Sequence, residues 1–161
     1  MRSLKTLCTM WLAAAALFLC NINVMAQNVP LDALVRTASQ WLSLSDVNQS
    51  DRMWDGSGPI MQKNISKQDW AKYLGNLRGE LGPLQGREWA QVARVVNPPG
   101  LPAGEYMNVM FNSRFARAAT TVEKISLTLA GGKWVPVGYV VEKIEPAPPT
   151  AAAPAAQPVK R

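Results

Sequence analysis

The hydrophobic pattern of this 161-residue chain changes its period once, close to Gly86. Before Gly86, apolar residues recur every three or four positions, which is typical of helices that bury one side. After it, apolar and polar residues alternate, which is typical of strands with one buried face. Helices followed by neighbouring antiparallel strands predict an α+β fold, with N-terminal helices packed on a sheet of about four strands.

Two helical segments are expected before residue 60. The first covers residues 30–44, and its apolar stripe consists of Leu31, Leu34, Val35, Ala38, Trp41 and Leu42. The second starts at Ser50 and has one or two turns, because the glycines and the proline of residues 56–59 break a helix.

The third expected helix has the clearest start signal in the chain. Ser66 can accept a hydrogen bond from an amide of the first turn, and Asp69 follows three residues later, as in a capping box. The helix is expected to end at Gly79 and Gly82-Pro83.

The strands are expected at residues 86–97 and 104–116 and in a hairpin over residues 120–143. In the second strand, one face is apolar and consists of Met107, Val109, Phe111 and Phe115.

The hairpin turns around two glycines, and its register depends on the length of the loop. A three-residue loop pairs Leu127 with Val135 and Glu123 with Tyr139, whereas a two-residue loop pairs Leu127 with Pro136. We favour the three-residue loop, since it keeps large apolar side chains together and gives glycine a left-handed position.

The last strand contains Pro136 and Gly138. Pro136 cannot donate a ladder hydrogen bond, which places it at a sheet edge or a bulge, and Gly138 allows a sharp bend. A bent final strand predicts a strongly curved sheet wrapped around the helices.

Residues 1–26 have the layout of a secretory signal peptide, because Arg2 and Lys5 precede an apolar run at residues 7–19. The run is shorter than the roughly 20 residues that cross a bilayer. We expect cleavage after Ala26, export to the periplasm and no transmembrane segment in the mature chain.

Both cysteines, Cys8 and Cys20, lie in this segment, so the mature chain cannot form a disulfide. Lipid attachment at Cys20 is the less favoured alternative, because Leu19 rather than a small residue precedes it. Residues 146–161 are rich in proline and alanine and are expected to form a disordered tail, which leaves residues 27–145 as one domain.

The absence of histidine excludes several kinds of chemistry. With no cysteine in the mature chain either, histidine-based triads, Cys/His zinc sites, haem and iron–sulfur ligation are not expected. The net charge is +6, but the basic residues are scattered and form no stripe for nucleic acid. We expect no metal, no cofactor and no nucleic-acid partner.

Carboxylate chemistry remains, and its candidate groups are Glu123, Glu105 and Asp46, with Tyr139 or Tyr106 as hydrogen-bond donors. Glu123 is the strongest candidate, because it shares a strand face with Ile125 and Leu127, where a carboxylate would be desolvated. A structural ion pair with an arginine explains the same pattern. We favour the ion pair, and therefore assign no residue as catalytic.

Four residues are candidates for ligand binding: Arg78, Arg87, Tyr106 and Trp134. Arg78 and Arg87 flank a glycine–proline turn and can form an anion site, although anchoring of the turn is the favoured alternative. The tryptophans of the mature domain are expected in the core rather than in a pocket, namely Trp41, Trp54, Trp70, Trp89 and Trp134.

An ordered series of residues carries a family resemblance: Trp41-Leu42, Trp54, Ser66, Trp70, Arg78, Leu81-Gly82, Arg87, Leu101-Pro102, Gly104-Glu105-Tyr106, Phe115, Glu123, Trp134 and Gly138-Tyr139. On these residues, the chain resembles the secreted bacterial family DUF4019, of uncharacterised function, over about residues 31–144. The family layout is similar to the NTF2-like or cystatin-like superfamily, which implies helices in the concave face of a strongly curved sheet. The segment 56–59 departs from the more helical stretch that is usual in the family.

Because that superfamily includes enzymes and binding modules alike, the fold does not settle the function. We expect a secreted, periplasmic, non-catalytic module that binds an unknown small ligand or an envelope protein. The alternatives are a small isomerase or hydrolase with a carboxylate in the cone, and an envelope protein tethered by its tail. A homodimer through the outer sheet face is a further hypothesis, because Trp134, Pro136 and Val140 need cover.

Overall fold

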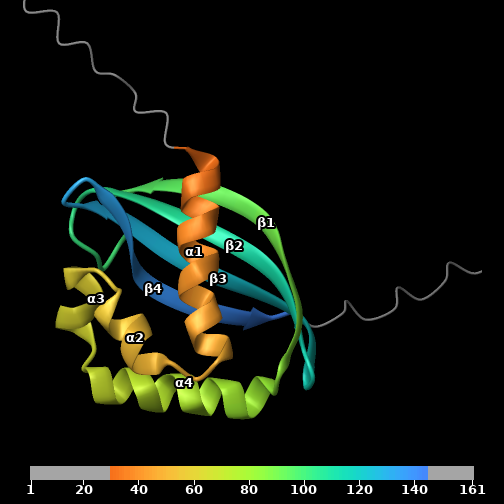
Figure 1. Ribbon diagram of the computed structural model, residues 1–161. Coiled ribbons are helices and arrows are strands. Elements are labelled where there is room, and N and C mark those ends of the chain that lie inside the picture. The colour runs from red at the N-terminus through yellow and green to blue at the C-terminus, as the bar shows by residue number, and fades with distance from the viewer. Residues whose placement is uncertain (1–29, 145–161) are drawn as a thin grey trace, which may run out of the picture.

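The structure is a computed structural model that describes residues 30–144. Its elements are α1 (Leu31–Asp46), α2 (Ser50–Asp55), α3 (Pro59–Asn64), α4 (Lys67–Leu81), β1 (Leu84–Val96), β2 (Glu105–Phe115), β3 (Ala118–Ala130) and β4 (Lys133–Lys143). The strands form one open antiparallel sheet in the order β1-β2-β3-β4, and Figure 1 shows the helices on one side of it. The predicted α+β order is confirmed.

Several predictions concern residues that the structure does not describe. The signal peptide, its cleavage after Ala26, the alternative at Cys20 and the tail at residues 146–161 all lie outside the described residues. Within residues 30–144, no helix is long and apolar enough to cross a membrane.

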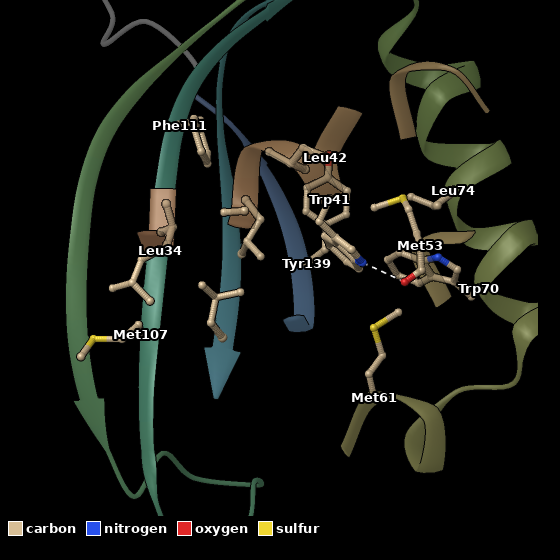
Figure 2. Close-up of a cluster of buried hydrophobic side chains, with 14 residues drawn as sticks. Leu34, Trp41, Leu42, Met53, Met61, Trp70, Leu74, Met107, Phe111 and Tyr139 are labelled. Atoms are coloured by element: carbon tan, nitrogen blue, oxygen red, sulfur yellow. Dashed lines mark hydrogen bonds between the residues drawn. The ribbon is translucent and has the colours of Figure 1, made fainter. Parts of the chain in front are cut away.

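A single core cluster joins the four helices to the sheet (Figure 2). Its buried members are Leu34, Ala38, Trp41, Leu42, Met53, Met61, Trp70, Leu74, Met107, Val109, Phe111, Ile125, Leu127 and Tyr139. The indole N–H of Trp41 donates to the carbonyl of Met53 at 2.8 Å, and the Trp41 ring stacks on Trp70 with centroids 5.7 Å apart. Trp41 therefore ties three helices to one another.

The prediction of a core position is wrong for Trp89, which is 48% exposed. Trp89 lies on β1, which is an edge strand and has a neighbouring strand on one side only. An aromatic residue in a strand pattern is therefore not always buried.

The predicted start of α4 is confirmed. The hydroxyl oxygen of Ser66 accepts a hydrogen bond from the amide of Asp69 at 3.1 Å, and the hydroxyl donates to the Asp69 carboxylate at 2.7 Å. The helix continues past Gly79 and ends at Leu81, where Gly82 has a φ of 75° that favours glycine.

The predicted break at residues 56–59 is also present, but α3 follows it directly and was not expected. The break allows the backbone to reach the edge of the sheet, because the amide of Gly58 donates to the carbonyl of Pro136 at 2.7 Å. A Cβ atom at Gly58 would lie 2.7 Å from a methyl group of Val135, so only glycine permits this approach.

The favoured hairpin register is wrong. The loop has two residues, Gly131 and Gly132, and both have positive φ, as a tight two-residue turn of this kind requires. Leu127 therefore pairs with Pro136, and Glu123 with Val141.

A bulge in β4 then restores the match between apolar faces. Ser126 pairs with Gly138 and Leu127 with Pro136, so Val137 is the additional residue, and Ile125 pairs with Tyr139. The predicted edge or bulge position of the proline is confirmed, because β4 is an edge strand and the bulge follows Pro136.

The outer face of β4 is less apolar than the dimer hypothesis assumed. Pro136 is buried, Trp134 packs against the core cluster, and Val140 is 45% exposed. Of the three residues that were expected to need cover, Pro136 is buried and Trp134 is partly buried on the side of the helices.

Candidate functional site

Charged side chains from four elements meet at one end of the core. Asp46 ends α1, Arg78 lies in the last turn of α4, Arg87 lies on β1 and Glu123 on β3. We call these four residues, together with Ser113 of β2 and Tyr139 of β4, the Glu123 network. From the sequence, Arg78 and Arg87 were expected at one turn, and Glu123 beside an arginine. The full set was not assembled, and Ser113 was not singled out.

Glu123 is fully buried and accepts hydrogen bonds at both carboxylate oxygens. Its Oε2 accepts from Nε of Arg87 at 2.6 Å and from the hydroxyl of Ser113 at 2.5 Å. Its Oε1 accepts from Nη2 of Arg87 at 3.1 Å and from the hydroxyl of Tyr139 at 2.5 Å. A carboxylate with four donors in place is stable without water.

Arg87 is shared between two carboxylates. Its Nη1 and Nη2 donate to the two oxygens of Asp46 at 2.7 and 3.1 Å, while Nε and Nη2 face Glu123. Burial lowers the pKa of Arg87, but the hydrogen bonds and charges of Asp46 and Glu123 outweigh burial and raise the pKa above its ordinary value. The guanidinium therefore remains charged.

Tyr139 is a neutral donor of the network, like Ser113. Burial raises the pKa of Tyr139 well above its ordinary value, and the charge and hydrogen bond of Glu123 raise it further. The phenol therefore stays protonated at physiological pH and serves as a fixed hydrogen-bond donor.

Arg78 is held less completely. Its Nε donates to the hydroxyl of Ser45 at 2.8 Å, and its guanidinium lies 5.1 Å from the centre of the Phe115 ring. Nη2 lies 3.1 Å from Asp46 Oδ1, which is an ion-pair distance, but the N–H direction does not form a hydrogen bond. Among residues 30–144, neither Nη1 nor Nη2 of Arg78 has a hydrogen-bond acceptor.

Two hollows adjoin Arg78. The larger has a volume of about 320 Å³ and is lined by Asp46, Asn48, Arg78, Gly82, Leu84 and Arg117, among others. The smaller has a volume of about 140 Å³ and lies between Ser45, Asn48, Leu74 and Arg78. We call the larger hollow the Arg78 cleft. Glu123 and Arg87 line neither of the two.

The other candidate residues lie apart from the Glu123 network. Glu105 forms an ion pair of 2.8 Å with Arg94, whose hydrogen bond lowers the pKa of the Glu105 carboxyl. Tyr106 is buried, and its hydroxyl donates to the carbonyl of Pro102 at 2.8 Å. Trp134 lines a third hollow of about 220 Å³ with Trp41 and Leu44.

Three polar residues of the site were missed. Ser113 had a signal, because it is the one polar residue on the apolar face Met107–Phe115 of β2. Asn48 and Arg117 had none, since each stands in a connection between elements whose position depends on the fold.

A comparison with family models confirms the family part of the resemblance seen in the sequence. No curated protein and no solved structure matches the chain. A family with the description "Protein of unknown function (DUF4019)" matches residues 37–139, which include every member of the Glu123 network. The chain therefore belongs to the DUF4019 family.

Proposed function

We propose that this protein is exported and acts in the periplasm as a non-catalytic module that binds a small ligand. The observation that carries the proposal is the state of Glu123, which is the strongest candidate for a catalytic base. Glu123 has no exposed surface, and both of its oxygens are occupied by donors from Arg87, Ser113 and Tyr139.

A general base must come within hydrogen-bond reach of the proton that it removes. No substrate reaches Glu123 unless the network opens. Both oxygens of Asp46 are held by Arg87, and Glu105 is paired with Arg94. The enzyme alternative requires a free carboxylate base in an open cavity. None of the three candidate carboxylates meets this requirement.

Binding without chemistry is supported by hollows that border charged and aromatic side chains. The Arg78 cleft and the hollow at Trp134 are both large enough for part of a small molecule. The helical layer on one face of the sheet is also consistent with a cone of the NTF2-like or cystatin-like kind (Figure 1). Export rests on the signal-peptide layout of the sequence.

The proposal is tested on the protein purified from the periplasm of cells that export it. Native mass spectrometry should find a retained small molecule, or a thermal-shift screen of metabolites should find a compound that raises the melting temperature. The compound should be recovered unchanged after incubation with the protein.

Conversion of the compound into a product by the wild-type chain, and its loss in a folded Glu123→Gln variant, would overturn the non-catalytic assignment. Retention of the protein in the cytoplasm with residues 1–26 still attached would overturn the assignment to the periplasm.

A further inference from the structure

Of the two arginines in the Glu123 network, Arg78 uses fewer of its hydrogen-bond donors than Arg87 does. A guanidinium has five N–H donors. Within residues 30–144, Arg78 donates one hydrogen bond, from Nε to Ser45, whereas Nη1 and Nη2 are buried without an acceptor. Buried donors without an acceptor are rare in proteins and require an explanation. Nη1 and Nη2 can still donate hydrogen bonds to a partner with anionic oxygens.

The position of Arg78 makes such a partner feasible. Its side chain is 13% exposed and borders both the Arg78 cleft and the smaller hollow beside it. Asn48 also borders both hollows, and its φ of 58° is uncommon for a residue other than glycine. This left-handed conformation closes the end of α1, where the amide of Asn48 donates to the carbonyl of Ser45 and the amide of Gln49 to that of Leu44. The Asn48 side chain adds an amide group to the wall.

The charges that face the cleft favour an anion. Asp46 is the acidic residue in its wall, and both Asp46 oxygens already accept hydrogen bonds from Arg87. The carbonyls at the end of α4 are used as well, because Arg117 donates through its side chain to Gly79 and through its amide to Leu81. The charges of Asp46 and Glu123 are balanced by those of Arg87 and Arg78, so Arg117 gives the wall of the cleft one excess positive charge. That charge, together with the unused N–H groups of Arg78, can attract an anionic ligand.

We propose that the Arg78 cleft binds a small molecule that carries a carboxylate or phosphate group, with Arg117 and Arg78 as its cationic contacts. This inference rests on the proposed function and specifies the chemical class of the ligand. Arg117 is exposed and meets the anion at the mouth of the cleft. Arg78 then turns from Asp46 and Glu123 toward the anion, and both carboxylates keep Arg87 as their partner.

The test is a calorimetric titration of the exported protein with inorganic phosphate and, separately, with succinate. Ethanolamine at the same ionic strength is the cationic control. At least one of the two anions should bind with a saturable isotherm, and ethanolamine should not. The two arms distinguish a phosphate ligand from a carboxylate ligand.

Variants locate the site. Arg117→Gln should weaken anion binding about tenfold or more, because it removes a charged hydrogen-bond donor. Arg117→Lys keeps the charge and should retain more of the affinity than Arg117→Gln. The matched control is Arg36→Gln, which removes the same charge from an exposed position on α1, ten residues before Asp46. It should leave the affinity unchanged, and circular dichroism should show each variant folded.

Three outcomes would overturn the inference. They are the absence of saturable binding of either anion in the millimolar range, equal weakening by Arg36→Gln and Arg117→Gln, and tighter binding of ethanolamine than of the anions. None of these results would contradict the proposed function, since the screen described above can still find a neutral or cationic ligand. Conversion of a ligand into product would instead contradict the proposed function, even if the anion site were correct.

Discussion

Glu123 shows what a single buried charge requires. Its carboxylate is tolerated because Arg87 supplies the opposite charge, and because Ser113 and Tyr139 complete its hydrogen bonds. When one partner of a buried ion pair is removed, the other partner is left desolvated without compensation. The stability of the domain should therefore depend strongly on this one residue.

Replacement of Glu123 by glutamine should lower the free energy of unfolding by about 3–5 kcal/mol. Glutamine has nearly the same shape, but it lacks the charge and presents an N–H group where Arg87, Ser113 and Tyr139 all donate. Urea denaturation measures the change.

The matched control for this substitution is Glu105→Gln, which removes an exposed ion pair with Arg94 and should change stability little. Equal stability of the Glu123→Gln variant and the wild type would show that the Glu123 network does not hold the fold together.

Tyr139 should make the domain less stable at alkaline pH. Burial, followed by the charge of Glu123, raises the pKa of Tyr139 in the folded protein. Above pH about 10 the unfolded chain loses this phenolic proton and the folded chain keeps it, so the free energy of unfolding falls as pH rises. The contribution of one proton is about 1.4 kcal/mol per pH unit.

The Tyr139→Phe variant has no phenolic proton at this position, so its free energy of unfolding should fall less steeply above pH about 10 than that of the wild type. The two slopes should differ by about 1.4 kcal/mol per pH unit. Urea denaturation at several alkaline pH values measures both slopes. Burial also raises the pKa of Tyr73, but Tyr73 is present in both proteins and does not affect the difference. Parallel slopes would show that Tyr139 titrates normally in the folded state.

At the scale of elements, the sequence predicted the features that depend on a few neighbouring residues. The start of α4 follows from Ser66 and Asp69, and the buried face of β2 follows from simple alternation. The register of the β3–β4 hairpin did not follow, because apolar pairing and a left-handed glycine both favoured a three-residue loop, whereas the turn has two residues. The bulge at Val137 brings the apolar faces back into register. Pro136 indicated an edge or a bulge, but not that a bulge would accompany the shorter loop.

The turn between α2 and α3 gives a prediction at this scale, since it docks on β4 through the backbone of Gly58. Gly58→Ala should lower the free energy of unfolding by about 1–3 kcal/mol, because the new Cβ would lie 2.7 Å from Val135 and 3.0 Å from Val137. Both contact atoms belong to stiff β-branched side chains that cannot easily move away.

The matched control is Gly75→Ala, within α4, where a Cβ meets no atom of the described residues within 4 Å. This substitution should raise the free energy of unfolding by about 0.5–1 kcal/mol, because alanine favours a helix more than glycine does. Thermal or urea denaturation compares the two variants, and effects of the same sign would contradict the proposed role of Gly58.

At the scale of the whole molecule, the candidate site could not be assembled from the sequence. Its charged members span residues 46–123 and come from α1, α4, β1 and β3. The alternation of β3 indicated that Glu123 is buried, and the preference for an ion pair was correct. The choice of Arg87 as its partner required the pairing of β1 with β2 and of β2 with β3, and the contact of Arg87 with Asp46 required the packing of α1 on the sheet. No single segment encodes either.

The same packing predicts how the whole domain unfolds. One core cluster includes residues of all four helices and of β2, β3 and β4, so the helices and the sheet should lose their structure together. Trp41 reports on the helical layer through Met53 and Trp70, and on the sheet through Tyr139, whose ring centroid lies 6.1 Å away. Tryptophan fluorescence and far-ultraviolet circular dichroism should therefore give superimposable urea transitions.

Trp41→Phe should lower the free energy of unfolding by about 1–3 kcal/mol, because it leaves the buried carbonyl of Met53 without its donor. Both transitions should therefore move to lower urea. Trp89→Phe is the matched control, since Trp89 is 48% exposed and its replacement should leave the midpoints unchanged. A fluorescence transition at lower urea than the circular dichroism transition would mean that the helices leave the sheet first. In that case the core would consist of two weakly coupled layers, and the ion pairs that join α1 to β1 and α4 to β3 would not suffice to hold the layers together.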